Sequence, residues 1–501
     1  MRRLCISIFL ATLDSTIVNT ALISITDSLK GFDQSSWLVN AYLLTYTGFL
    51  VIASKLSDIF GRRAIIAASL VLFTIASICC GVAQTLAQLI VFRAFQGIGG
   101  AGLYTMVLVV LPEMCTPAQY PLYSTIVSMV SVFSSLLGPI LGGAISQKLT
   151  WRWIFFLNIP PGILALGLLY TAIPSHFPHS RPSDALKMSM QSIRRLDIIG
   201  TVLLLAATTL FLLALEENSI GHSWTNAIVV SPLVASLVLW CAFFGWSKYQ
   251  ASRNTVQEPV LPWRVLKNRF CLALFFNAFW TGCLLYSAVF TLPQMFQIVH
   301  KTSSITTGYW LLPLTLSVPV GSAVSATLMA KNHVPPFYLI LIGSILQALG
   351  IGLMTWLPIG SEKFLDSGYG FETICGFGIG VSTAVSILTA MLVFEKEDLS
   401  VGMGWFGQFR SLGGCVGVSV CINIMNKYIT SQLASELSLE QMAAVKLSAS
   451  AVNSFPKAIQ IMVRGAYAGG FLWQSYAMMA FGSVAILTVL LMVEKNLRKQ
   501  M

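Results

Sequence analysis

The stretch WLVNAYLLTYTGFLVIASKLSDIFGRRAIIAASLVLFTIASICCGVA, residues 37–83, establishes the pattern of the whole chain. Two apolar runs, Trp37 to Ser54 and Ala64 to Ala83, flank a short charged corner that contains Gly61. A membrane-spanning helix needs about 20 mainly apolar residues, and each run supplies roughly that many. A corner this short must be a tight turn, which glycine permits. The stretch therefore predicts two membrane helices joined by a tight charged turn.

The same pattern extends over the rest of the 501 residues, of which 56% are hydrophobic and 10% charged. Soluble domains carry about 25% charged residues, so this chain cannot cover a water-facing surface. We expect an all-α polytopic membrane protein with fourteen spans in groups of six, two and six. The predicted spans are Leu4–Thr26, Trp37–Ser54, Ala64–Ala83, Leu86–Leu111, Leu122–Ile145, Ile154–Ile173, Ile198–Leu215, Ala227–Trp246, Phe270–Val299, Thr307–Ala330, Phe337–Leu357, Phe371–Phe394, Met403–Met425 and Phe471–Val493.

Positive charge predicts the orientation of these spans. Of the 30 Lys and Arg residues, 19 lie in connections that are inside if the N-terminus is inside, and nine lie in the others. Cytoplasmic connections are enriched in Lys and Arg, so both termini are expected in the cytoplasm. The connection 426–470 is then expected outside. A signal peptide, suggested by Arg2 and Arg3 followed by an apolar run, is the alternative interpretation, but Asp14 interrupts this run and no small-residue cleavage site is obvious.

Several classes of protein are disfavoured by composition and motifs. The net charge of +11 is spread among connections, so no nucleic-acid surface is predicted. Most of the ten cysteines sit in apolar runs without a CxxC pair, so we expect no metal site and no disulfide framework. No P-loop, nucleophile elbow or HExxH motif is present, so we expect neither an enzyme nor a cofactor. A transporter of this composition would draw on an ion gradient.

Ionisable residues within spans are the main functional candidates, because each costs about 2.5–3.5 kcal/mol at a helix centre. They are Asp14, Arg93, Arg410 and, near a helix end, Glu372. All five histidines lie in connections, so a proton relay would have to use carboxylates. Asp14 could gain and lose a proton during transport. Its alternative role is a permanently paired residue that locks two helices together.

Helical spacing from Arg93 places Gln96, Gly97, Gly100 and Tyr104 on one face. This face fits the polar lining of an interior cavity, although close helix packing is the alternative. Arg410 shares its face with three glycines, and packing and function are equally good explanations there. The aromatic residues and methionines of the interior, such as Tyr286 and Trp405, could line a pocket, but packing is the favoured reading.

Two further charged or small-residue patterns stand out. Lys55, Asp58, Arg62 and Arg63 crowd the corner after the second span, where they could form a switchable ion-pair cluster or simply set the topology. In the fifth span, small residues recur every fourth position and a proline lies among them, which predicts a tightly packed, kinked helix. These residues are Ser134, Gly138, Pro139, Gly142 and Ser146.

Together these fragments resemble the major facilitator superfamily, and specifically its fourteen-helix drug:proton antiporter family of fungi. SKLSDIFGRR resembles the loop motif GxLaDrxGrr, and LDSTIVNTAL resembles the first-helix motif. FRAFQGIGGAG resembles the fourth-helix motif, and LLGPILGG resembles the antiporter motif gxxxGPxxGG of the fifth helix. WRWIFFLNIPPG and FRSLGGCVGVSV are also similar to this family. The motifs occur in the family's order and cover nearly the whole chain.

The resemblance implies a six-helix bundle over residues 1–173, a linker with two inserted helices over 174–269, and a second six-helix bundle over 270–501. It implies alternating access around a midplane substrate site. By motif position, the resemblance and the reasoning above assign the following residues: proton coupling to Asp14 and Arg93; the substrate cavity to Asn19, Gln96 and Arg410; the gating loop to Lys55, Asp58, Gly61, Arg62 and Arg63; the antiporter helix to Gly138, Pro139, Gly142 and Gly143.

The sequence departs from the family pattern at a few positions. Ser54 and Ser134 stand where the motifs carry glycine, and Ile23 stands where proline is usual. After the fourth helix, LPEMCTPAQYPLY keeps Glu113 but lacks the arginines that usually follow.

The resemblance implies proton-driven efflux of amphipathic organic compounds such as mycotoxins, other secondary metabolites or drugs. We expect a monomer in the plasma membrane, with a vacuolar or vesicle membrane as the second choice. A proton-coupled importer of a siderophore, amino acid or other solute is the alternative with the same fold. A non-transporting membrane sensor is the second alternative, and a membrane-embedded enzyme is the third.

Overall fold

A computed structural model describes residues 4–29, 35–116, 119–172, 195–253, 257–332, 334–357, 364–395, 397–434, 436–438, 441 and 455–493. Within these residues the long elements are all helices, and β-structure is limited to one isolated bridge between Leu196 and Glu258. The helices are α1 (Leu4–Leu29), α2 (Ser35–Phe60), α3 (Arg62–Val82), α4 (Leu86–Met114), α5 (Tyr120–Lys148), α6 (Arg152–Phe156), α7 (Ile159–Ala172), α9 (Ile198–Ile220), α10 (Ala227–Ala251), α11 (Trp263–Lys267), α12 (Arg269–Ile298), α13 (Ser304–Trp310), α14 (Leu312–Asn332), α15 (Pro336–Met354), α16 (Asp366–Val393), α17 (Leu399–Leu433), α19 (Lys457–Val489) and the 3₁₀ helix η5 (Leu490–Met492).

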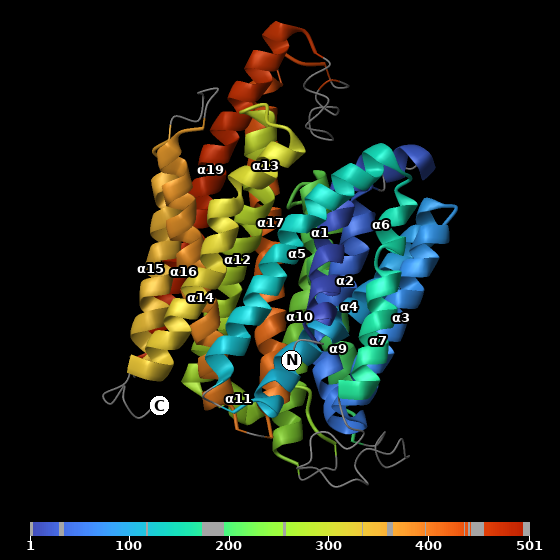
Figure 1. The fold of residues 1–501 in the computed structure, drawn as a ribbon, viewed down its shortest axis with the longest axis vertical. Coiled ribbons are helices and arrows are strands. Elements are labelled where there is room, and N and C mark those ends of the chain that lie inside the picture. Colours follow the sequence, from blue (N-terminus) through green and yellow to red (C-terminus); the bar gives the residue numbers. More distant parts are fainter. Residues whose placement is uncertain are drawn as a thin grey trace.

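The expected number of membrane crossings is confirmed. In the described part of the chain, 13 apolar segments are long enough to span a membrane, and α1 adds a further helix of 26 residues with an apolar half at Cys5–Val18. The crossings run nearly parallel through the molecule (Figure 1). Two of them are interrupted, because α6 and α7 together form one crossing and α13 and α14 form another. The protein is therefore a multi-pass, all-helical membrane protein.

Helix packing divides the crossings into two groups. In the first group α4 packs between α2 and α3, and α1 packs along α5. In the second group α16 packs between α14 and α15, while α12 packs against α17 and α19. The helices α9 and α10 pack on each other, and α9 also contacts α2 and α17, one helix from each group. The groups meet directly where α5 contacts α14 and where α2 contacts α17.

Three predicted helix ends differ from the structure by six residues or more. The helix α2 continues to Phe60, so the corner consists of Gly61 alone, which has a φ of 94° that favours glycine. The helices α17 and α19 extend to Leu433 and back to Lys457, so much of the predicted connection 426–470 is helical. The reason is that backbone hydrogen bonds continue a helix through polar residues where the apolar pattern has already ended.

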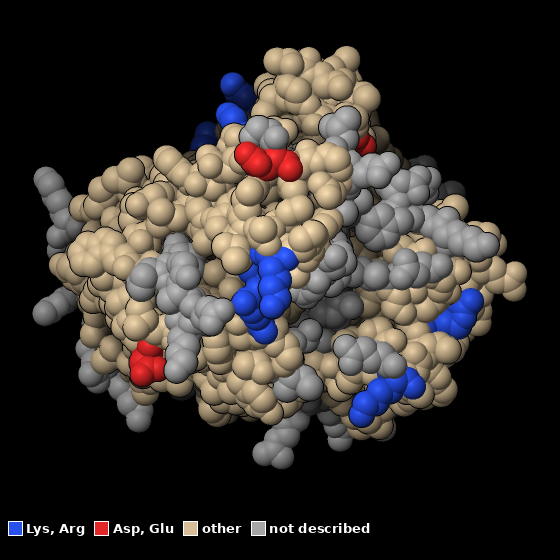
Figure 2. Space-filling model, turned by 90° about the horizontal axis from the view of Figure 1, so that it is seen from above, with Lys and Arg blue, Asp and Glu red and all other residues tan. Residues whose placement is uncertain are grey.

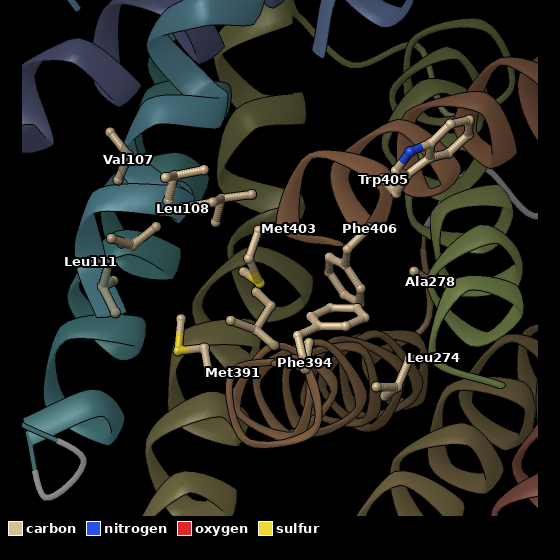
Figure 3. Close-up of a cluster of buried hydrophobic side chains, with 14 of the residues drawn as sticks. Val107, Leu108, Leu111, Leu274, Ala278, Met391, Phe394, Met403, Trp405 and Phe406 are labelled. Carbon is tan, nitrogen blue, oxygen red and sulfur yellow. The ribbon is translucent and has the colours of Figure 1, made fainter. Parts of the chain in front are cut away.

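A buried apolar layer joins the two groups near the α2–α3 corner. Figure 3 shows Met391 of α16 and Met403 and Phe406 of α17 lying opposite Leu108 and Leu111 of α4. We call these five side chains the inter-bundle layer. At the other end of the molecule, nearer α6 and α13, only scattered charged side chains interrupt the surface (Figure 2). The inter-bundle layer therefore brings α4 of the first group into contact with α16 and α17 of the second group.

Candidate functional site

The centre of the first group holds a buried carboxylate, that of Asp14 on α1. Its Oδ2 lies 2.5 Å from Nη1 of Arg93, and the carboxylate is completely buried. Its Oδ1 accepts hydrogen bonds from Gln96 Nε2 at 2.9 Å and from Asn158 Nδ2 at 3.0 Å. Charge-assisted hydrogen bonds of this kind are about twice as strong as neutral ones. The carboxylate thus joins α1, α4 and the break between α6 and α7.

Arg93 has three further partners besides Asp14. Its Nε donates to the carbonyl of Leu38 at 3.1 Å, and Nη1 also donates to Gln96 Oε1 at 2.8 Å. The guanidinium carbon lies 4.3 Å from the ring centroid of Tyr42, a cation–π distance. Removing one partner of a buried ion pair costs about 3–5 kcal/mol, because the other charge is left uncompensated. Arg93 therefore fixes α2 and α4 around the Asp14 carboxylate.

Asn158 and Ser77 were not among the residues predicted from the sequence. Ser77 on α3 accepts a hydrogen bond from Gln96 Nε2 at 2.6 Å, and Asn158 completes the set of donors around Asp14. Asn158 lies between α6 and α7, directly before the Ile-Pro-Pro that begins α7. An amide in the apolar run WRWIFFLNIPPG is the signal that could have identified it.

The remaining residues that were predicted to line a cavity lie outside the Asp14 cluster or outside the described residues. Gly97 and Gly100 allow α4 to pack closely against Tyr42 of α2, as expected if this face of α4 serves helix packing. Arg410 on α17 donates from Nη1 to the Tyr104 hydroxyl at 3.3 Å and is not joined to Asp14. The side chain of Asn19 lies outside the described residues.

The corner between α2 and α3 holds a second buried charge cluster, centred on Arg62. Its Nη1 lies 2.7 Å from Asp58 Oδ1, and its Nη2 lies 2.7 Å from Glu113 Oε1 on α4. Nη1 also donates to the hydroxyl of Ser400 on α17 at 3.3 Å. Arg63, the next residue, is half-buried. The cluster therefore joins the corner to α4 and reaches the second helix group.

Two further contacts lie near this corner, and the first of them joins the two helix groups. The Ser54 hydroxyl donates to the carbonyl of Ser400 at 2.6 Å. Lys55 Nζ lies 2.6 Å from Glu258 Oε2, and Arg195 donates to the same carboxylate from Nε at 2.9 Å. Partial burial raises the pKa of Glu258, but the Lys55 and Arg195 charges outweigh it, so the pKa lies below its usual value. Glu258 is therefore an ionised link between α2 and the segments that flank α9 and α10.

The antiporter-type segment of α5 packs directly on α1. A Cβ atom added at Gly138 would collide with the hydroxyl of Thr16 and approach the backbone nitrogen of Ile17. One turn earlier, the hydroxyls of Ser134 and Thr12 are hydrogen-bonded to each other. A Cβ atom at Gly143 would meet nothing within 4 Å. Gly138 is therefore a close-approach residue, and Gly143 is not.

Gly142 is buried like Gly138, whereas the side chain of Pro139 is outside the described residues. The structure thus places α5 against α1 through one glycine and one serine of the predicted stripe. Thr12 and Thr16 are each two residues from Asp14, so the contact with α5 uses a different face of α1 from the one that carries the buried carboxylate.

The second helix group contains its own buried carboxylate, Glu372 on α16. It is completely buried, and both of its oxygens lack a hydrogen-bond partner among the described residues. The contrast with Asp14 is clear, because Asp14 has three donors. Glu372 was expected to be a costly ionisable residue near the end of a span, and the structure buries it completely within the second helix group.

A family model and similar proteins indicate the same protein family, and solved structures share its fold. A family model described as Major Facilitator Superfamily matches residues 4–418. The MFS-type transporter FPY5 of Fusarium mangiferae is 40% identical over 499 residues, which cover 99% of this chain and 83% of that protein. Efflux pump FUS6 of Gibberella fujikuroi is 30% identical over 450 residues, covering 89% and 76%. Among solved structures, the proton:xylose symporter XylE superposes with a TM-score of 0.62 at 13% identity, covering 99% of this chain and 95% of that one.

Proposed function

Because the chain belongs to the major facilitator superfamily and is a membrane transporter, we propose that it exports small amphipathic organic compounds in exchange for protons. The compounds are of the secondary-metabolite, toxin or drug class. The name of the similar efflux pump FUS6 supports the outward direction. The antiporter-type sequence LLGPILGG, whose Gly138 packs on α1, supports the same direction.

The observation that carries the proton coupling is the buried Asp14–Arg93 pair. The charged carboxylate holds Arg93, Gln96 and Asn158 together. A proton on Asp14 removes the charge that these donors bind, so it weakens every link at once. Binding and release of one proton thus change how firmly α1, α4 and the α6–α7 break are joined. This is the two-state element that a proton gradient can bias.

The Arg62 cluster and the inter-bundle layer form the gate in this proposal. Alternating access requires the two helix groups to separate first at one end and then at the other. Contacts between the groups near the α2–α3 corner, such as Ser54 with Ser400, must break when that end opens. We assign this end to the cytoplasm and the protein to the plasma membrane, in accord with the Lys and Arg bias of the connections.

Transport in sealed vesicles tests the proposal. The full chain is reconstituted into liposomes, an acidic-outside or acidic-inside pH gradient is imposed, and movement of a panel of fluorescent dyes and fungal toxins is followed. Movement of at least one compound against the direction of proton flow supports proton-coupled export. Movement of compounds only along with protons would instead support import, and no response to the gradient would contradict coupling.

A further inference from the structure

A partly buried arginine, Arg410 on α17, differs from the fully buried Arg93 and Arg62. Arg93 pairs with Asp14, and Arg62 pairs with two carboxylates. In the described part of the chain no Asp or Glu forms an ion pair with Arg410. Its Nη1 donates one hydrogen bond, to Tyr104, and its Nε is buried without a partner. A guanidinium stays charged, so α17 carries an uncompensated positive charge within the membrane.

Phenols surround this charge instead of carboxylates. Tyr104 on α4 and Tyr46 on α2 come from the first helix group, and Tyr286 on α12 comes from the second. The rings of Tyr46 and Tyr104 lie 6.1 Å apart between centroids. The guanidinium of Arg410 therefore lies between the two helix groups, where an exporter of this architecture binds its substrate.

Tyr286 shows that this place is reachable. It packs against α17, because a Cβ atom at Gly414 would meet its ring. It is also close enough to Tyr42 and Tyr104 of the first group to interact with them electrostatically. Nevertheless it is 41% exposed, which is unusual for a side chain between two helices. Solvent or a ligand can therefore reach the ring beside Arg410.

Asp14 cannot supply the missing negative charge. Its two oxygens already accept from Arg93, Gln96 and Asn158, and it is completely buried. A cation in a low-dielectric space attracts an anion far more strongly than it would in water. A planar guanidinium also matches the geometry of a carboxylate, with which it can form two parallel hydrogen bonds. The positive charge at Arg410 is thus a site for an anion that the described residues do not provide.

We propose that Arg410, with Tyr46, Tyr104 and Tyr286, binds organic anions whose acidic group pairs with the guanidinium and whose flat conjugated body packs on the tyrosine rings. Aromatic rings stack favourably on one another, and the phenols add hydrogen bonds to polar substituents. The inference rests on the proposed export function, and it narrows the substrate from amphipathic compounds in general to conjugated acids.

Matched pairs of probes test the charge requirement. Binding of 1-naphthoate, 9-anthracenecarboxylate and 1-pyrenecarboxylate is compared with binding of their neutral carboxamides by quenching of intrinsic fluorescence in the detergent-solubilised full chain. At least one acid should bind about tenfold more tightly than its amide, which corresponds to about 1.4 kcal/mol. Equal affinity within every pair, or no binding by any acid, would overturn the proposal.

Variants assign the preference to Arg410. Arg410→Gln should lower acid binding to the level of the amide, whereas Arg410→Lys, which keeps the charge, should retain part of the preference. Thermal unfolding of each variant and its amide binding show that the protein is still folded. An unchanged acid-to-amide ratio in folded Arg410→Gln would overturn the proposal.

The binding assay uses no gradient, so it separates this proposal from the proton coupling. An Asp14→Asn variant should keep the acid preference while losing gradient-driven transport. If acids and amides bind alike in the wild type but a pH gradient drives export, the anion site fails and the export function stands. If acids are preferred but no gradient drives transport, the anion site stands and the coupling fails.

Discussion

The Asn158 side chain donates a hydrogen bond of 3.0 Å to the Asp14 carboxylate, although the two residues lie 144 positions apart. Both side chains are buried, and Asn158 occupies the break between α6 and α7. The bond links the first helix of the first group to its last. A change of charge on Asp14 therefore alters a contact between the first and the last crossing of the group.

Asn158→Leu should impair transport without abolishing the Asp14–Arg93 pair. The leucine cannot donate, so one oxygen of Asp14 loses a donor in a buried place, at a cost of about 1–3 kcal/mol. We expect a lower melting temperature and a several-fold slower gradient-driven flux. Differential scanning fluorimetry and vesicle flux measure the two effects. Wild-type values of both would remove Asn158 from the site.

Glu113→Gln should loosen the gate end of the protein. Glu113 is the carboxylate of α4 that binds Arg62, and the neutral amide cannot form this ion pair. We expect a cysteine placed at Met391 in the inter-bundle layer to react several-fold faster with a maleimide in this variant. Glu436→Gln, an exposed change after α17, is the matched control and should leave the rate unchanged. Equal rates in all three proteins would contradict the gate.

The Lys55–Glu258–Arg195 link should make stability depend on pH. Because the pKa of folded Glu258 is lowered, its contribution is present above the ordinary pKa of a glutamate and is lost as pH falls through the lowered value. Glu258→Gln should lower stability by up to about 1 kcal/mol at pH 7, since solvent screens a partly exposed pair.

The comparison is made by thermal unfolding of the wild type and Glu258→Gln in detergent from pH 7 to pH 3. The difference between the two melting temperatures should shrink as the pH falls. A difference that is constant over this range would mean that the charge of Glu258 does not stabilise the fold.

Gly138→Leu should disrupt the contact between α5 and α1. The new side chain would overlap Thr16, and forcing atoms into a packed contact costs about 1–3 kcal/mol or more. Gly143→Leu on the same helix is the control, because a Cβ atom there meets nothing within 4 Å. We expect Gly138→Leu to lose transport and Gly143→Leu to resemble the wild type in folded yield and flux. The reverse order would show that the packing is misassigned.

Local patterns were enough to predict the crossings and the chemistry at single positions. Asp14, Arg93 and the charged corner stood out because ionisable groups are costly in apolar segments. Glu113 was noticed only as the family's acidic residue after the fourth helix, and the structure shows that it pairs with Arg62. The roles assigned to these residues stay predictions.

Long-range partners were not predictable in the same way. Ser54 and Ser400 are 346 residues apart, and no local periodicity indicates that their helices touch. The same is true of Glu258 with Lys55, because an acidic residue in a polar connection resembles any solvated charge. Helix ends were misplaced at α2, α17 and α19, since helices continue beyond the apolar stretch that identifies them.

The most direct test of the account compares the wild type, Asp14→Asn and Asp366→Asn in the same vesicle assay with an imposed pH gradient. Asp366 is an exposed aspartate in the first turn of α16 and is the matched control. The account predicts gradient-driven movement of substrate in the wild type and Asp366→Asn, and none in Asp14→Asn protein that is folded and still binds substrate. Gradient-driven transport by Asp14→Asn at the wild-type rate would contradict it.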